Sequence, residues 1–149
     1  MSLEKEVMSK MKEAMKAKDS ISLESLRAIK TAITMAKTET GADSISDDQE
    51  LKILQKLVKQ RKDSAQLYKE QGREDLANPE LAQAAIIEGF LPAQLSPEEL
   101  ENEVQAIIDQ TGASSMKDMG KVMGLASKNL GGSADGKSIS TVVKKLLNS

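Results

Sequence analysis

Residues 96–112 read SPEELENEVQAIIDQTG, and this one stretch contains every signal of a complete amphipathic helix. Ser96 can accept a backbone hydrogen bond while Glu99, three residues later, reaches back to it, which is the capping-box pattern of a helix start. The apolar residues that follow, Leu100, Val104, Ile107 and Ile108, recur at helical spacing. Gly112 can end the helix in the left-handed conformation. The stretch predicts an α-helix with one buried face.

The same kind of pattern repeats on both sides of this helix. Towards the N-terminus, apolar residues three and four apart predict helices over about residues 3–18, 20–40, 46–71 and 78–88. The third helix has a capping box at Ser46, and Asn78 followed by Pro79 predicts a cap and a first-turn proline for the fourth. We expect the fourth helix to bury Leu81, Ala85 and Ile86. Towards the C-terminus, one helix begins at Ser115–Asp118 and ends at Gly131, and a last one carries the apolar residues of 139–147.

These helices predict an all-α fold of two domains, because no segment shows the sustained period-two alternation of a strand. The break at residues 89–96 divides the chain. Residues 1–93 are expected to form an N-terminal domain of long antiparallel helices, and residues 94–149 a small C-terminal three-helix domain.

The residue types that are missing exclude several classes of function. The chain of 149 residues has no His, Cys or Trp, and its aromatic residues are Tyr68 and Phe90. Without imidazole or thiolate there is no triad hydrolase and no zinc–thiolate site, so we expect no catalytic residues, no metal and no cofactor. Two aromatics cannot form a platform on which single-stranded nucleic acid stacks. Without a membrane-spanning or secretory segment, a cytoplasmic location is expected.

The charges are unevenly distributed although the formal net charge is only −2. Residues 96–111 contain five acids and no Lys or Arg, whereas residues 112–149 contain six lysines and two acids. A second basic cluster, Lys59, Arg61 and Lys62, lies in the third predicted helix. Such clusters bind a phosphate backbone in some proteins and form a solvated helix face in others, and both interpretations stay open here.

Two short motifs resemble catalytic signatures. Residues 131–138, GGSADGKS, match a nucleotide-binding loop, but that loop requires a preceding strand, and a helix is predicted there instead. A glycine-rich turn capped by Ser138 is the alternative. Ser114 and Lys117 have the Ser-x-x-Lys spacing of some acyl enzymes without the companion motifs, so a helix cap explains them better.

Four stretches carry a resemblance to a known family: KQRKDS at 59–64, LPAQLS at 91–96, GASSMKDMGKVMG at 112–124 and ADGK at 134–137. They resemble the signature blocks of the YqeY-like proteins, and the likeness spans essentially the whole chain. In that family the C-terminal half resembles the tail of the B subunit of the tRNA-dependent amidotransferase. The resemblance implies an all-helical fold and a tRNA-binding tail without the catalytic subunits, although such families are often labelled glutamine-dependent carbon–nitrogen ligases.

The resemblance leads to three hypotheses. The first is a tRNA-binding accessory module with Lys117, Lys121, Lys128 and Lys137 as phosphate contacts, and with Gly120 and Gly124 allowing close approach of a backbone or another helix. The second is a helical module that binds an amidotransferase or an aminoacyl-tRNA synthetase through the N-terminal helices. The third is a nucleotide-dependent enzyme that uses Lys137.

Overall fold

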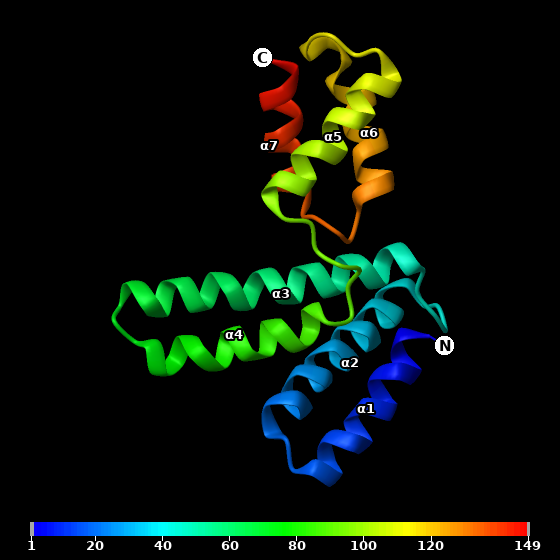
Figure 1. The fold of residues 1–149 in the computed structure, drawn as a ribbon. Helices are drawn as coiled ribbons and strands as arrows, with labels where there is room; N and C mark the ends of the chain where they lie inside the picture. Colours follow the sequence, from blue (N-terminus) through cyan, green and yellow to red (C-terminus); the bar gives the residue numbers. More distant parts are fainter. Residues whose placement is uncertain (1, 149) are drawn as a thin grey trace. The chain divides into compact units, whose positions relative to one another are not determined.

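The computed structural model describes residues 2–148 and confirms the predicted all-α fold (Figure 1). Within these residues the only β-type pairing is an isolated bridge between Gly131 and Ala134. The chain divides into two compact units, Met1–Leu91 and Pro92–Ser149, which are called unit 1 and unit 2 below. The described residues form seven α-helices and one short 3-10 helix: α1 Leu3–Ala17, α2 Ser20–Thr40, α3 Asp47–Glu70, α4 Glu74–Glu88, α5 Pro97–Thr111, η1 Met116–Asp118, α6 Met119–Leu130 and α7 Gly136–Leu147.

Unit 1 consists of two helical hairpins, α1–α2 and α3–α4, with α2 in contact with both helices of the second hairpin (Figure 1). Local sequence sets each turn. Lys18 takes the left-handed conformation with φ +56°, and the Asp19 carboxylate accepts a hydrogen bond from the Ser22 amide at 3.1 Å to cap α2. The predicted capping box of Ser46 and Gln49 is present at the start of α3. The short turn between α3 and α4 makes the second hairpin antiparallel.

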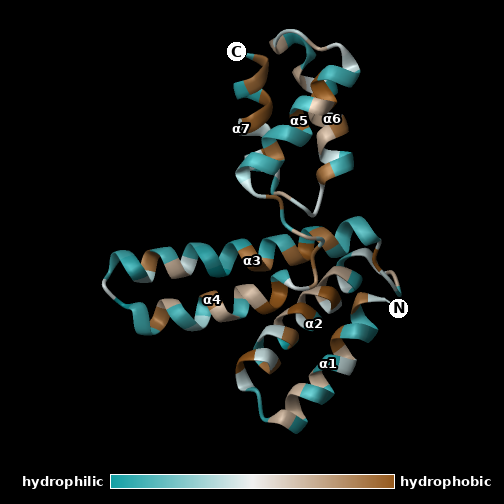
Figure 2. Cartoon of the chain, in the orientation of Figure 1, coloured by the Kyte–Doolittle hydropathy of each residue, from teal (hydrophilic) through white to brown (hydrophobic). Residues whose placement is uncertain are grey.

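Each unit has its own hydrophobic core, and Figure 2 shows apolar and polar residues alternating along the helices that supply them. In unit 1 the buried side chains come from all four helices: Leu3, Val7, Ala14, Leu26, Ile29, Ile33, Leu54, Val58, Ala84 and Ile87. Ser25 is also fully buried, and its hydroxyl donates to the Ile21 carbonyl oxygen at 2.8 Å, so this polar group is not left unpaired.

A polar link joins three helices of unit 1. The Nε of Arg61 in α3 donates to the Gln83 side-chain oxygen in α4 at 3.1 Å. The Gln83 side-chain nitrogen in turn donates to a carboxylate oxygen of Glu24 in α2 at 3.0 Å. Because the three residues come from different helices, these hydrogen bonds define how α2, α3 and α4 align along their axes.

The predicted start of the fourth helix is wrong. Helix α4 begins at Glu74 rather than at Asn78, and Pro79 lies inside the helix. The Arg73 guanidinium forms two hydrogen bonds to the Asp75 carboxylate, at 2.9 and 3.0 Å, across the helix start. Ala77 is completely buried. Extending the helix towards the hairpin turn therefore buries one more residue, and this packing outweighs the hydrogen bond that Pro79 cannot donate.

The predicted buried face of α4 is also wrong by one position. The buried residues are Ala77, Ala84 and Ile87, whereas Ala85 is exposed and Ile86 is only half-buried. Almost every residue from 81 to 87 is apolar, so the sequence of this helix shows little periodic contrast. Contacts with α2 and α3 decide which of these residues enter the core.

Unit 2 is a three-helix unit formed by α5, α6 and α7, with η1 leading into α6 (Figure 1). The predicted capping box of α5 is confirmed, since Ser96 and Glu99 bond each other reciprocally, and Gly112 ends the helix with φ +71°. The core contains residues of all three helices and of the turn before α7: Leu100, Val104, Ile107, Ile108, Val122, Ala126, Leu130, Ala134, Ile139, Val143 and Leu147.

Candidate nucleic-acid interface

Helix α6 presents one basic face to solvent. Its buried residues are Val122, Ala126 and Leu130, and the residues on the opposite side are exposed. Spacings of three, four and seven residues bring the exposed positions together on one side of the helix axis. We call these positions the α6 face: Lys117, Gly120, Lys121, Gly124 and Lys128. The structure therefore places three of the four predicted phosphate contacts and both predicted glycines on one surface. Lys137 lies on a different element, in the first turn of α7.

The ammonium groups of this face are available to a ligand. Within residues 2–148, the side chains of Lys117, Lys121, Lys128 and Lys137 are exposed and take part in no ion pair or hydrogen bond. Lys145 differs, because its ammonium group lies 3.4 Å from the Glu101 carboxylate. A bound anion could contact the α6 lysines without first breaking an internal ion pair.

The two glycines of the α6 face are not used inside the chain. A Cβ atom added to Gly120 or Gly124 would meet no atom within 4 Å. Both are exposed, and neither has a positive φ. No helix of the described residues approaches the backbone of α6 at these positions. Glycine in an exposed helix interior is destabilising by roughly 1 kcal/mol relative to alanine, so the fold itself does not account for these residues.

The second basic cluster is consumed by contacts within unit 1. The Lys59 ammonium lies 2.9 Å from the Asp63 carboxylate, and the Lys62 ammonium lies 3.3 Å from that of Glu88. The Arg61 guanidinium donates to Gln83 and to the Leu57 carbonyl oxygen. The solvated and internally paired helix face is therefore the better interpretation of this cluster, and the unpaired positive charge of unit 2 is the stronger candidate for phosphate binding.

The opposite charge of unit 2 is gathered on α5. This helix contains Glu98, Glu99, Glu101, Glu103 and Asp109 and no basic residue. Since α5 and α6 carry opposite charges, a polyanion is repelled from one helix and attracted to the other. The unit is thus electrostatically oriented although its total charge is small.

The stretch that resembles a nucleotide-binding loop has a different structure. It follows helix α6 directly, without a strand. Its backbone amides already have partners inside the chain: the amides of Gly131 and Ala134 donate to carbonyl oxygens of α6, and the Ser138 amide donates to the Asp135 carboxylate at 2.6 Å. Amides that are paired in this way cannot cradle a phosphate. Asp135 therefore caps α7, and the predicted capping role of Ser138 is wrong.

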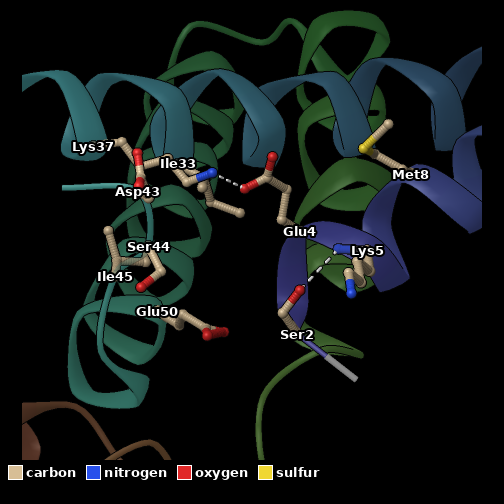
Figure 3. A pocket seen from close by; sticks show the side chains of 10 residues that line it. All are labelled: Ser2, Glu4, Lys5, Met8, Ile33, Lys37, Asp43, Ser44, Ile45 and Glu50. Carbon is tan, nitrogen blue, oxygen red and sulfur yellow. Dashed lines mark hydrogen bonds and ion pairs between the residues drawn. The ribbon is translucent and has the colours of Figure 1, made fainter.

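Unit 1 contains a separate cavity of about 380 Å³ between the start of α1, the end of α2 and the start of α3 (Figure 3). Its charged groups have internal partners, since the Lys37 ammonium donates to Glu4. Burial raises the pKa of the Glu50 carboxyl, and the charge of Asp47 raises it further, while a hydrogen bond from the Leu3 amide opposes both effects. The sequence analysis did not find this cavity, because its lining comes from segments far apart in the chain.

Two further searches limit the chemistry of the described residues. Among residues 2–148 no three His, Cys, Asp or Glu side chains lie close enough together to hold a metal ion. In the same part of the chain, no helix combines the length and the apolar character that crossing a bilayer requires.

Comparisons with known proteins agree with this architecture. The family model described as "Yqey-like protein" matches residues 4–147. The yeast proteins named "Altered inheritance of mitochondria protein 41, mitochondrial" are similar to this chain: that of Vanderwaltozyma polyspora is 29% identical over 73% of the chain and 62% of its own length, and that of Clavispora lusitaniae is 30% identical over 69% and 61%. The chain thus spans about three fifths of these relatives.

A third relative is a Glutamyl-tRNA(Gln) amidotransferase subunit of Thermococcus gammatolerans. It is 32% identical to this chain over 113 residues, which are 73% of the chain and 18% of the relative. Unit 2 is only 58 residues long, from Pro92 to Ser149. The similarity to an amidotransferase subunit therefore extends into unit 1 and is not restricted to the C-terminal half, as the sequence analysis expects.

Proposed function

The chain belongs to the YqeY-like family, and from this relationship we propose that it is a tRNA-binding accessory module without catalytic machinery of its own. The observation that carries the proposal is the α6 face, with three unpaired lysines on one exposed side of a helix. The name of the relative from Thermococcus gammatolerans, which includes glutamyl-tRNA, supports tRNA as the polyanion.

Phosphate contacts are the chemistry that this face can provide. A lysine ammonium group binds a phosphate oxygen as a point charge, and releasing the counterions condensed on the nucleic acid supplies much of the free energy of binding. Each phosphate contact contributes about 0.9 to the slope of log affinity against log salt concentration on a duplex. Gly120 and Gly124 add no side chain between these lysines, so a sugar–phosphate backbone can approach the helix closely.

The proposal is tested by measuring the affinity for tRNA at several salt concentrations. We expect Lys117→Ala and Lys121→Ala each to weaken binding and to lower the salt slope by about one unit. Lys12→Ala is the matched control, because Lys12 is an exposed lysine of α1 in unit 1. Equal losses for the control and the α6 variants, or binding of an unrelated DNA duplex as tight as that of tRNA, would contradict the proposal.

A second candidate is a module that binds an amidotransferase or an aminoacyl-tRNA synthetase. The favouring observation is that the matched region makes up only 18% of the relative from Thermococcus gammatolerans, where it is one part of a much larger chain. The exposed Leu67 and Leu76 near the turn of the α3–α4 hairpin would suit such a contact, since they are 57% and 39% exposed. Co-purification of either enzyme with the wild-type chain, but not with Leu67→Asp, would support this candidate.

Two narrower points follow from the proposal. An ATP-dependent activity requires nucleotide binding at the 131–138 turn, so calorimetry that detects ATP binding abolished by Lys137→Ala would favour an enzyme over an accessory module. The sequence analysis predicts the cytoplasm, whereas the yeast relatives are named as mitochondrial. Imaging of the tagged full chain in its own cells decides between these locations.

A further inference from the structure

We propose that the α6 face binds the base-paired arms of an RNA rather than single-stranded RNA, and that it does so without reading the base sequence. This inference rests on the proposed tRNA-binding function and specifies which part of the ligand is contacted. Three features of unit 2 carry it: the side chains that it lacks, the rigid spacing of those that it has, and the kind of cation that it uses.

Unit 2 has no aromatic side chain on which an unpaired base could stack. Both aromatic residues, Tyr68 and Phe90, belong to unit 1. Proteins that bind single strands obtain about 1–3 kcal/mol per base from stacking on aromatic rings. The α6 face offers charge alone, so an unpaired base would gain nothing from leaving its neighbours and approaching this surface.

The lysines of the α6 face are held at a fixed spacing. Lys121 and Lys128 are seven residues apart on one helix, which places their Cα atoms about 10 Å apart along the axis. A duplex also holds its phosphates at fixed positions and loses little conformational freedom on binding. A flexible strand would have to be ordered to match the row of charges, and the resulting entropy loss would not be offset by stacking.

The density and the type of charge point to the same ligand. A duplex carries about one negative charge per 1.7 Å of axis in B-DNA and releases more counterions per contact than a single strand does. Unit 2 contains six lysines and no arginine. Lysine lacks the planar fork by which arginine recognises the edge of guanine, so these contacts position a backbone without identifying its bases. Affinity should therefore depend on the strand being paired and not on its sequence.

The experiment measures fluorescence anisotropy of the full chain with four labelled RNAs at one salt concentration. These are a tRNA transcript, a hairpin with a long stem, the same hairpin with a permuted stem sequence, and an unstructured homopolymer with as many phosphates as the hairpin. We expect the two hairpins to bind equally and the homopolymer to bind about tenfold more weakly. The double variant Lys121→Ala, Lys128→Ala should reduce hairpin binding most, and Lys12→Ala should leave it unchanged.

The possible outcomes separate this inference from the function on which it rests. Binding of the homopolymer as tightly as the hairpins overturns the preference for paired RNA while the RNA-binding function stands. A marked difference between the two hairpins overturns the lack of sequence readout. If no RNA binds, the proposed function and this inference fail together. Because the substituted lysines are exposed, circular dichroism should show the helical content of the wild type in every variant.

Discussion

The side-chain amide of Gln94 donates a hydrogen bond to the carbonyl oxygen of Gly132 at 2.6 Å. The neighbouring Leu95 amide donates to the Ser133 carbonyl oxygen at 2.9 Å, so the segment before α5 is attached to the turn between α6 and α7. Gly132 is buried and has φ +89°, a conformation that favours glycine. This turn therefore serves as an attachment point within unit 2 and not as a phosphate loop.

The attachment predicts a stability effect. Gln94→Ala removes the hydrogen bond and leaves the Gly132 carbonyl without that donor, so we expect unit 2 to lose about 1 kcal/mol of stability. Urea unfolding followed by circular dichroism measures the loss. Gln110→Ala, which truncates an exposed glutamine at the end of α5, should change the stability little. A stability of Gln94→Ala equal to that of the wild type would show that water replaces the bond without cost.

The glycines of the α6 face are predicted to trade stability for binding. Gly120→Ala and Gly124→Ala should each stabilise unit 2 by up to about 1 kcal/mol, because alanine is the better helix former and the added Cβ meets open space. The same variants should weaken tRNA binding without changing the charge. Thermal unfolding and anisotropy on the same samples check both effects. Unchanged affinity in both variants would remove the glycines from the interface.

Gly131 provides the contrasting case for these two substitutions. A Cβ atom at this position would lie 2.5 Å from the Ser127 carbonyl oxygen. Gly131→Ala should therefore destabilise unit 2, in contrast to Gly120→Ala and Gly124→Ala, because the backbone at the end of α6 would have to shift.

Acid should destabilise unit 2 partly through Glu99. Hydrogen bonds from the Ser96 amide, and secondarily from its hydroxyl, lower the pKa of the Glu99 carboxyl below its ordinary value of 4.5. A lowered folded-state pKa adds stability above the unfolded-state pKa, and this contribution is lost as the pH falls through the folded-state pKa. Glu99→Gln should therefore lose less stability than the wild type between neutral pH and pH values below 4.5. Urea midpoints across this range measure the difference.

Glu98→Gln is the control for the acid effect. It removes the same charge from the same helical turn but not the capping bond to Ser96. If both variants show the same pH dependence, the effect comes from the overall charge of α5 and not from the capping box.

Separate cores predict separate unfolding effects. Ile33 belongs to the core of unit 1 and Ile139 to that of unit 2, and they are 1% and 2% exposed. Replacing either by alanine should cost about 2–5 kcal/mol through lost burial and the cavity left behind. Hydrogen exchange should show Ile33→Ala lowering protection in α1–α4 and Ile139→Ala lowering it in α5–α7. Uniform loss of protection across both units would mean that they unfold as one.

Pro79 offers a stabilising substitution. It is exposed and lies inside α4, where its ring nitrogen cannot donate to the carbonyl oxygen four residues earlier. Pro79→Ala restores a donor at this position, and we expect a gain of about 1 kcal/mol in the free energy of unfolding, reduced by the greater freedom of the unfolded chain. Thermal unfolding measures the change, and a loss of stability would indicate that the ring makes contacts that outweigh the missing bond.

Features with local causes could be predicted from the sequence. Both capping boxes, at Ser46 and Ser96, depend on residues three positions apart, and the structure confirms them. The left-handed helix ends at Gly41 and Gly112 have the same local origin. These signals, together with helical periodicity, sufficed to predict the all-α class.

Features that depend on distant residues could not be predicted in this way. The start of α4 is decided by burial of Ala77 in the α3–α4 hairpin, which overrides the local signal of Asn78 and Pro79. The basic cluster around Arg61 is neutralised by partners in α4 that are more than twenty residues away. The α6 face was accessible to prediction because all its members lie within twelve consecutive residues, although whether its lysines were paired was not.

The link through Gln83 explains why an amide is the only suitable side chain at this position. Its oxygen accepts from Arg61 and its nitrogen donates to Glu24, so it is an acceptor towards a cation and a donor towards an anion. Glutamate would place two carboxylates side by side, and lysine would place an ammonium group against a guanidinium. Among side chains of this length, only glutamine satisfies both neighbours, so tolerance to substitution at this exchange point between three helices should be very narrow.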